Sequence, residues 1–379
     1  MPRKILLILA LIAIIGSIYY IENQTVDKAP ASTDGQSQIM GMTKAEKQKK
    51  YPWAYELSSI DGYINTGLSA GGEPQQFKIG DLIGKKVILV DFWTYSCINC
   101  QRTTPYLNDW YVKYKDLGLE IIGVHTPEFE FEKNYANVTK AVEKFGIKYP
   151  VVLDNDFSTW RDYQNRYWPR KYLIDIDGYI VYDHIGEGGY DETEAKIQEL
   201  LAERAKALGL EMKNPLDMPV GGVDKSTGAG AIQPGSPEVY FGSTRNELLS
   251  NGTPGKNGSV AFTLPAEFVK NRLYLGGKWT LTDEYARSES KGAKIVFRYE
   301  GKDVYMVARA SKGTLLHVFL DGKKVESSMG FDLAASSSES LFISEDRLYH
   351  IIHHSSNEEH VLELEADGAG VEVYTFTFG

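Results

Sequence analysis

The chain has 379 residues, 42% of them hydrophobic and 24% charged, which is typical of globular protein and long enough for about two to three domains. The 41 Lys and Arg residues against 51 Asp and Glu give a net charge of −10, and no long basic run occurs, which argues against a nucleic-acid partner. Only two cysteines occur, Cys97 and Cys100, which excludes a multi-disulfide framework and a four-cysteine zinc site.

The first 22 residues predict an export segment. Arg3 and Lys4 precede an uncharged apolar run at residues 5–21, the pattern of a secretory signal or signal anchor. The run ends at Tyr19 and Tyr20 rather than at small residues, which favours an uncleaved anchor over a cleaved signal peptide. We therefore expect a single-pass membrane protein with its domains outside the cytoplasm, or a secreted protein if the segment is cleaved.

Residues 51–210 carry the pattern of an α/β domain, after a polar stretch at 23–50 that predicts a flexible tether. Apolar runs alternate with amphipathic segments, so we expect a mixed sheet flanked by helices. The expected strands are 87–93, 120–125, 151–153, 172–175 and 179–184, and the expected helices are 101–114, 136–145 and 192–208.

A second, all-β domain is expected at residues 237–379, after a Gly/Pro-rich linker at 211–236. Short alternating segments separated by turns predict a jelly roll or β-sandwich. The expected strands are 259–264, 294–299, 303–308, 315–320, 347–353, 360–365 and 371–378.

The two cysteines follow the predicted strand 87–93 and stand at the start of the next predicted helix. A helix N-terminus stabilises an anion and lowers the pKa of a thiol placed there. We therefore expect Cys97 to be the exposed thiolate that attacks a partner disulfide. Cys100, one turn further into the helix, would be the resolving thiol that attacks the mixed disulfide and releases the partner.

Other roles for the cysteine pair stay open at this point. A disulfide across two residues closes too small a loop to stabilise much, and a zinc half-site lacks two further ligands nearby in sequence. Covalent haem attachment requires His directly after the second cysteine, where this chain has Gln101. The main alternatives to redox exchange are a copper-binding or delivery protein that uses the thiols with a histidine such as His125, and a cell-surface binding module with a structural cysteine pair.

The sequence around the cysteines resembles the thioredoxin superfamily. The string W-T-Y-S-C-I-N-C-Q-R at residues 93–102 is similar to a narrower group, the extracytoplasmic TlpA/ResA-like domain at the C-terminus of DipZ-type proteins. Three further stretches match that group: G-V-H-T-P-E-F at 123–129, N-R-Y-W-P at 165–169 and G-E-G-G-Y at 186–190. The end of the chain, 370–379, resembles the carbohydrate-binding-module-like domain of the same proteins, so the resemblance covers about residues 55–379.

The resemblance implies roles for Asp91 and for the Trp168-Pro169 dipeptide. Asp91 matches the buried acid that relays a proton for the resolving thiol, a group that the attack by Cys100 requires. The alternative is a carboxylate satisfied by a donor at the strand end. Trp168-Pro169 matches the cis-proline loop on which a substrate backbone docks, and the alternative is an ordinary trans turn.

Pro169, Trp168, Trp93, Tyr95 and Glu128 form the predicted substrate-binding set, and no metal or cofactor is predicted. Glu128 follows a strand that should neighbour the cysteine-bearing strand, where it would tune the thiols or the charge preference for substrates; otherwise it is a solvated loop acid. The three aromatic residues would wall the site against solvent, or else belong to the ordinary core.

The dipeptide between the cysteines, Ile98-Asn99, carries no cation, so we expect a reducing to intermediate potential and a reductase rather than an oxidant. The clients would be proteins with disulfides or dithiols. DipZ-type proteins carry a CcdA-like multi-span electron importer, whereas this chain has one hydrophobic run. The resemblance therefore implies a separate CcdA-like membrane donor.

The β domain offers two weaker candidates. Tyr240, Trp279 and Tyr285 are possible sugar-stacking residues, but a structural or client-docking role is favoured over sugar binding. Four histidines lie close in sequence: His350, His353, His354 and His360. Strand alternation places His350 and His354 on one face and His353 on the other, and surface histidines are the favoured interpretation over a metal site.

Overall fold

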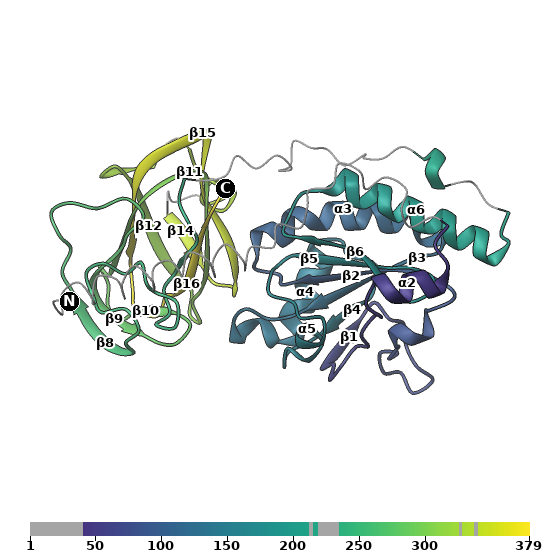
Figure 1. Cartoon of the computed structure of the whole chain (residues 1–379). Coiled ribbons are helices and arrows are strands. Elements are labelled where there is room, and N and C mark those ends of the chain that lie inside the picture. The colour runs from purple at the N-terminus through teal and green to yellow at the C-terminus, as the bar shows by residue number, and fades with distance from the viewer. Residues whose placement is uncertain (1–40, 212–214, 219–234, 326–327, 337–339) are drawn as a thin grey trace, which may run out of the picture. The chain divides into compact units, whose positions relative to one another are not determined.

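The computed structural model describes residues 41–211, 215–218, 235–325, 328–336 and 340–379 (Figure 1). The predicted export segment at 1–22, most of the tether at 23–50 and most of the linker at 211–236 lie outside these residues. In the part of the chain that is described, no helix combines the length and apolar character needed to cross a membrane. The described residues from 44 onward form one compact unit.

Six strands form a mixed sheet in the order β1-β4-β3-β2-β5-β6. Strands β2, β3 and β4 run parallel to one another, and β1, β5 and β6 pair antiparallel. Every side chain of β2 is buried, as its continuous apolar run predicts for a central strand. The bounds are β1 Gly62–Ile64, β2 Val87–Trp93, β3 Leu119–His125, β4 Val151–Leu153, β5 Arg170–Ile174 and β6 Ile180–Ile185.

Helices cover both faces of this sheet, as predicted for an α/β domain. Helices α3 and α6 lie side by side on one face (Figure 1), where the rings of Tyr106 and Tyr190 stack 3.6 Å apart. Successive residues of β2 point to opposite faces, and Phe92 contacts Trp160 of α5. Asp91 therefore faces α3, while α5 covers the other face. The bounds are α3 Ile98–Tyr114, α4 Tyr135–Lys144, α5 Ser158–Asp162 and α6 Tyr190–Leu208.

The expectation of a flexible tether through residue 50 is wrong for its last seven residues, which form helix α2, Lys44–Lys50. The fully buried ammonium of Lys47 lies 2.7 Å from Asp175, 2.9 Å from Asp177 and 2.6 Å from Glu203. This buried ion-pair network fixes α2 against the α/β domain. The polar composition of residues 44–50 gave no indication of this network, because the partners of Lys47 are more than 120 residues away in sequence.

The C-terminal part of the chain is an all-β domain, as predicted, in which every strand pairing is antiparallel. Its core is a single apolar cluster that includes Trp279, Tyr299 and Phe376. Jelly-roll connectivity stays a prediction. The bounds are β7 Val239–Tyr240, β8 Gly258–Phe262, β9 Leu273–Leu281, β10 Ala286–Ser288, β11 Lys294–Arg309, β12 Thr314–Leu320, β13 Lys323–Lys324, α7 Phe331–Ala334, β14 Ser340–Ile343, β15 Arg347–Ala366 and β16 Glu372–Phe378.

Two long strands replace four predicted short ones. The segments 294–299 and 303–308 belong to β11, and 347–353 and 360–365 belong to β15. The two strands pair with a register shift between Gly301 and Asp303, so a bulge continues the ladder where two separate strands were expected.

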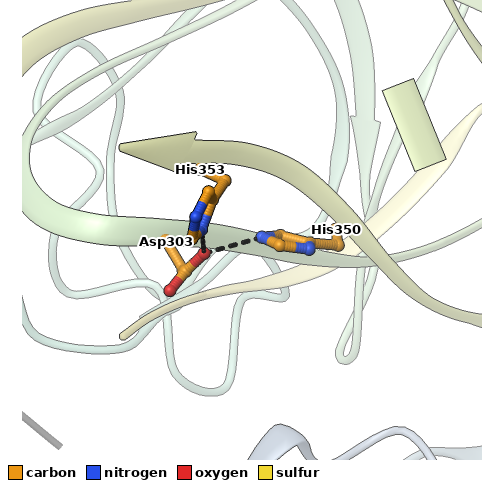
Figure 2. A group of neighbouring side chains, drawn as sticks. All are labelled: Asp303, His350 and His353. Atoms are coloured by element: carbon orange, nitrogen blue, oxygen red, sulfur yellow. Dashed lines mark hydrogen bonds and ion pairs between the residues drawn. The ribbon is translucent and has the colours of Figure 1, made fainter. Parts of the chain in front are cut away.

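A second register shift overturns the predicted placement of the histidines on strand faces. Val304 pairs with Ile352 while Tyr305 pairs with His350, so one extra residue is inserted on β15. The insertion reverses the alternation, and His350 and His353 point to the same side of the sheet (Figure 2).

Candidate active site

The cysteines lie at the start of α3, and three residues separate Cys97 from the end of β2. Cys97 is the N-cap residue of α3, and its sulfur accepts a hydrogen bond from the Cys100 amide at 3.4 Å. Cys97 is partly exposed, whereas Cys100 is buried. Burial, together with hydrogen bonding to Cys97, raises the pKa of the Cys100 thiol. The arrangement therefore presents one accessible sulfur and holds a second, protonated one behind it.

A cis-proline loop faces the exposed cysteine. The Trp168-Pro169 peptide bond is cis, as the resemblance implied. The Cys97 sulfur lies 4.0 Å from the carbonyl oxygen of Trp168, and the Trp168 indole donates to the carbonyl oxygen of Thr126 at 3.0 Å. A main-chain carbonyl is thereby held next to the exposed sulfur, just before the start of β5.

Asp91 is buried on β2, on the face that carries α3. Burial raises its pKa to about 7, and the nearby Lys171 opposes that rise. The carboxyl oxygen Oδ1 has no hydrogen-bond partner among the described residues. Asp91 also acts on Cys100, because its negative charge contributes to the raised pKa of that thiol. An acid poised near neutrality thus lies within electrostatic reach of the buried cysteine.

Lys171 is a site residue that the sequence did not reveal. It pairs directly with Asp91 in the β2–β5 register and is fully buried. Burial lowers the pKa of its ammonium, while Asp91 and Cys100 act in the opposite direction. Its Nζ donates to the carbonyl oxygen of Gly186 at 3.1 Å. In sequence it is one charged residue just before the predicted strand 172–175, with no motif around it to mark it.

Glu132 is a second residue that was missed, and it holds the segment before Cys97. Its carboxylate accepts from the Ser96 hydroxyl at 2.5 Å and from the backbone amides of Glu128 and Phe129 at 2.6 and 3.0 Å. Burial raises its pKa to about 7, while the Ser96 hydrogen bond opposes that rise. The carboxylate ties the cysteine loop to the loop after β3.

Glu128, predicted as a possible site acid, lies beside the cysteines but is neutralised by the β domain. Its Oε1 accepts from Arg245 at 2.7 Å and from the Tyr240 hydroxyl at 3.0 Å. The Arg245 guanidinium also lies 3.7 Å from the centre of the Tyr240 ring. Tyr240, a candidate sugar-stacking residue, is thus engaged in this cluster. The alternative of a solvated loop acid is excluded for Glu128.

Trp93 and Tyr95 do not line the cavity next to Cys97. Both are buried and pack on His125, with ring centres 5.2 and 5.7 Å from its imidazole. Burial lowers the pKa of His125 to about 3, and its Nε2 accepts from the Tyr95 amide at 3.4 Å. These residues form an aromatic layer behind the cysteine loop. Among the described residues, no cluster of possible metal ligands includes either cysteine or His125.

A cavity of about 420 Å³ opens at the exposed cysteine. Of the predicted site residues, Cys97, Glu128 and Trp168 line it, and Pro169 does not. The β domain contributes as well, through residues that the sequence did not associate with the cysteines. These residues are Glu238, Tyr240, Arg245, Val307, Thr375 and Thr377.

Two sequence families match the chain. The family described as Redoxin matches residues 27–201, and the family described as Thioredoxin like C-terminal domain matches residues 236–379. Protein DipZ of Mycobacterium bovis is 37% identical over 326 residues, which cover 86% of this chain and 43% of DipZ. The chain thus spans less than half the length of DipZ.

Thiol-disulfide oxidoreductase ResA of Bacillus cereus is 33% identical over 143 residues, which cover 35% of this chain and 79% of ResA. A solved thiol-disulfide isomerase from Corynebacterium glutamicum superposes with a TM-score of 0.35 at 20% identity, over 41% of this chain and 98% of that one. The match to ResA extends over more than two thirds of that protein. The chain therefore belongs to the thioredoxin superfamily, with ResA and DipZ among its relatives.

Proposed function

We propose that the protein is a thiol:disulfide oxidoreductase that reduces disulfides of client proteins outside the cytoplasm. The observation that carries the proposal is the pairing of an accessible Cys97 at a helix N-terminus with a buried Cys100 one turn further on. The cis-proline loop next to Cys97 supports the proposal, since it offers a client backbone a carbonyl at the reactive sulfur.

The reaction proceeds in two exchanges that balance in sulfur, protons and electrons. The Cys97 thiolate attacks one sulfur of the client disulfide, forms a mixed disulfide and expels the other client sulfur as a thiolate. Cys100 then loses its proton, attacks the Cys97 sulfur and expels the second client thiolate. The client gains two electrons, and its two thiolates take up the proton that Cys100 loses and the proton that Cys97 released to solvent when it ionised. The protein is left with a Cys97–Cys100 disulfide that a separate electron donor must reduce.

Asp91 is the group proposed to accept the Cys100 proton. A base that acts near neutral pH needs a pKa close to that pH, and burial brings Asp91 to about 7. Lys171 is proposed as a positioning residue, whose charge stabilises the carboxylate once Asp91 is ionised.

The proposed location follows from the sequence. The apolar run at residues 5–21 behind Arg3 and Lys4 supports a membrane anchor with the domains outside the cytoplasm. A membrane protein of CcdA-like type is the proposed donor that returns electrons to Cys97 and Cys100. The copper-delivery alternative is less well supported, because His125 is buried and already accepts a hydrogen bond from Tyr95.

Replacing Cys100 with Ser should trap clients on Cys97. Without a resolving thiol, the mixed disulfide persists, so oxidised client proteins should remain attached in non-reducing electrophoresis and be released by dithiothreitol. The matched control is Cys97→Ser, which retains the buried thiol and should trap nothing. If the Cys100→Ser variant also captures no client, the proposed exchange is wrong.

Replacing Asp91 with Asn should change how stability depends on pH. Asp has a pKa of about 3.9 in the unfolded chain, and in the folded protein its value rises to about 7. The folded state therefore binds the Asp91 proton more tightly, and the wild type loses stability as pH rises through this window. The free energy of unfolding of the variant minus that of the wild type should increase by about 1–4 kcal/mol between pH 4 and pH 7.5.

Urea unfolding of both reduced proteins across this pH range measures the difference. Thr139→Val on α4 is a suitable control, since neither the threonine nor the valine side chain titrates. Its difference from the wild type should stay constant over the same range. If the free energy of unfolding of Asp91→Asn minus that of the wild type stays constant or falls as pH rises, the raised pKa of Asp91 is refuted.

Replacing Arg245 with Gln should shift the preference of Cys97 among charged disulfides. The change leaves Glu128 uncompensated beside the cavity, so the site becomes more negative. The rate ratio of anionic oxidised glutathione to cationic cystamine should fall by about two- to fivefold at low ionic strength, and the effect should shrink in high salt. Stopped-flow fluorescence of the reduced protein measures both rates.

Arg287→Gln provides the charge-matched control, because Arg287 lies on β10, is paired with Glu289 and does not line the cavity. It should leave the ratio unchanged. An equal shift in both variants would show that net charge, and not the β-domain wall of the cavity, sets the preference.

A further inference from the structure

Three clusters of possible metal ligands occur among the described residues, and one already holds a cation. Asp175, Asp177 and Glu203 surround the ammonium of Lys47 at 2.6 to 2.9 Å. That ammonium supplies the positive charge that a metal ion would otherwise bring, so this cluster is a structural ion-pair network.

The second cluster is satisfied by hydrogen bonds alone (Figure 2). Oδ1 of Asp303 lies 2.8 Å from His350 Nε2 and 2.7 Å from His353 Nδ1. The backbone amide of Phe331 donates to His350 Nδ1 at 3.3 Å, so the proton of a neutral His350 ring lies on Nε2 and points at Asp303. A metal ion on Nε2 would move that proton to Nδ1, where it would point at the amide hydrogen of Phe331.

The third cluster differs, and we propose that His354, Glu358 and His360 bind a divalent transition-metal ion of the zinc type. Their ligand atoms lie within 4.8 Å of one another. Glu358 Oε2 is 3.3 Å from His360 Nε2 and 3.9 Å from His354 Nδ1. Tetrahedral zinc with bonds of about 2.0–2.2 Å holds neighbouring ligand atoms about 3.3 Å apart, which is close to these spacings. The Glu358–His360 contact is also a direct hydrogen bond, whereas His354 Nδ1 is too far from Glu358 for one and is free to bind an ion.

Hydrogen bonds on the far side of each ring direct the remaining nitrogen towards Glu358. His360 Nδ1 lies 2.6 Å from Asp321 Oδ2, and His354 Nε2 lies 2.7 Å from the Tyr299 hydroxyl. A carboxylate on the outer nitrogen of a histidine is the usual support of a metal ligand, because it fixes the tautomer and the ring orientation. The Val361 amide holds Asp321 in turn, at 2.9 Å.

The fold brings the three ligands together through an irregularity in β15. Glu358 pairs with Gly301 and His353 pairs with Asp303, so residues 354–357 face a single residue of β11. The bulge stacks the rings of His354 and His360 at 4.6 Å between centres and 19° between planes. Because His354 is buried and His360 is partly exposed, we expect His360 to tilt its ring when the ion binds.

A cavity of about 540 Å³ borders all three ligands. It gives water, or a small anionic molecule, access to the fourth position of a tetrahedral ion. Imidazole and carboxylate ligands together favour Zn²⁺ over Mg²⁺ or Ca²⁺, which prefer oxygen ligands throughout.

Calorimetric titration with Zn²⁺ tests the site in the untagged full-length chain that carries Cys97→Ser and Cys100→Ser, so that the thiols bind no metal. One ion should bind per chain. Glu358→Gln and His360→Gln should each weaken binding at least tenfold, and Asp321→Asn, which removes only the support of His360, about tenfold. Glu358 is 39% exposed, so its variant keeps the fold, and thermal unfolding checks this for each protein.

His350→Gln is the matched control, since it removes a histidine of β15 from the hydrogen-bonded cluster and should leave Zn²⁺ binding within about twofold of the parent. Co²⁺ should give the visible absorption of a tetrahedral ion in the parent and not in Glu358→Gln. No stoichiometric binding, or binding lost in His350→Gln and kept in His360→Gln, would overturn the proposal. Because the titration uses a protein without its thiols, its outcome is independent of the proposed redox function.

Discussion

The burial of Asp91 against Lys171, on the sheet face that carries Cys100, is the interaction on which the site depends. Removing a carboxylate and an ammonium from water costs several kcal/mol for each ion, and their mutual attraction and the hydrogen bond from Lys171 to the Gly186 carbonyl offset part of that cost. The β2–β5 register aligns the two residues, and burial moves their pKa values in opposite directions, that of Asp91 upward and that of Lys171 downward. The strand pairing thereby determines the protonation chemistry of the site.

The remaining features give the two cysteines different environments. The end of β2 and the first turn of α3 expose Cys97 and bury Cys100, and Glu132 fixes the loop before them through Ser96. The β domain completes the entrance through Arg245, which neutralises Glu128 next to the exposed sulfur. The exposed Cys97 thiol, beside side chains of both charges, suits the attack on a client disulfide. The buried Cys100 thiol behind it suits the second step, in which the client is released.

Local sequence signals were enough for the elements that form the centre of the site. The apolar run of β2, the cysteine spacing, Asp91 and the Trp168-Pro169 dipeptide each lie within a short motif, and the structure has the predicted strand and the cis peptide. Lys171 could not be found in this way, because its role depends on the register of a strand that begins about 80 residues after Asp91. The same holds for Glu132, which reaches Ser96 only because two loops meet.

The β domain shows a second limit of sequence patterns. Alternation assigned His350 and His353 to opposite faces, but an inserted residue in β15 turns both towards Asp303. The bulge buries two consecutive residues, Ile351 and Ile352, and reorients the polar side chains that follow. Trp93 and Tyr95 are the converse case, since their nearness in sequence to Cys97 suggested a cavity wall and they pack instead behind it.

The reduction potential of the Cys97–Cys100 couple, measured by equilibration with glutathione redox buffers and alkylation of the free thiols, tests the central claim most directly. A client-reducing protein should form an intramolecular disulfide with a potential more negative than about −200 mV, in the range of known reductants. A couple near −120 mV would identify an oxidant. Failure of the two cysteines to form a disulfide at all would contradict the account of the site.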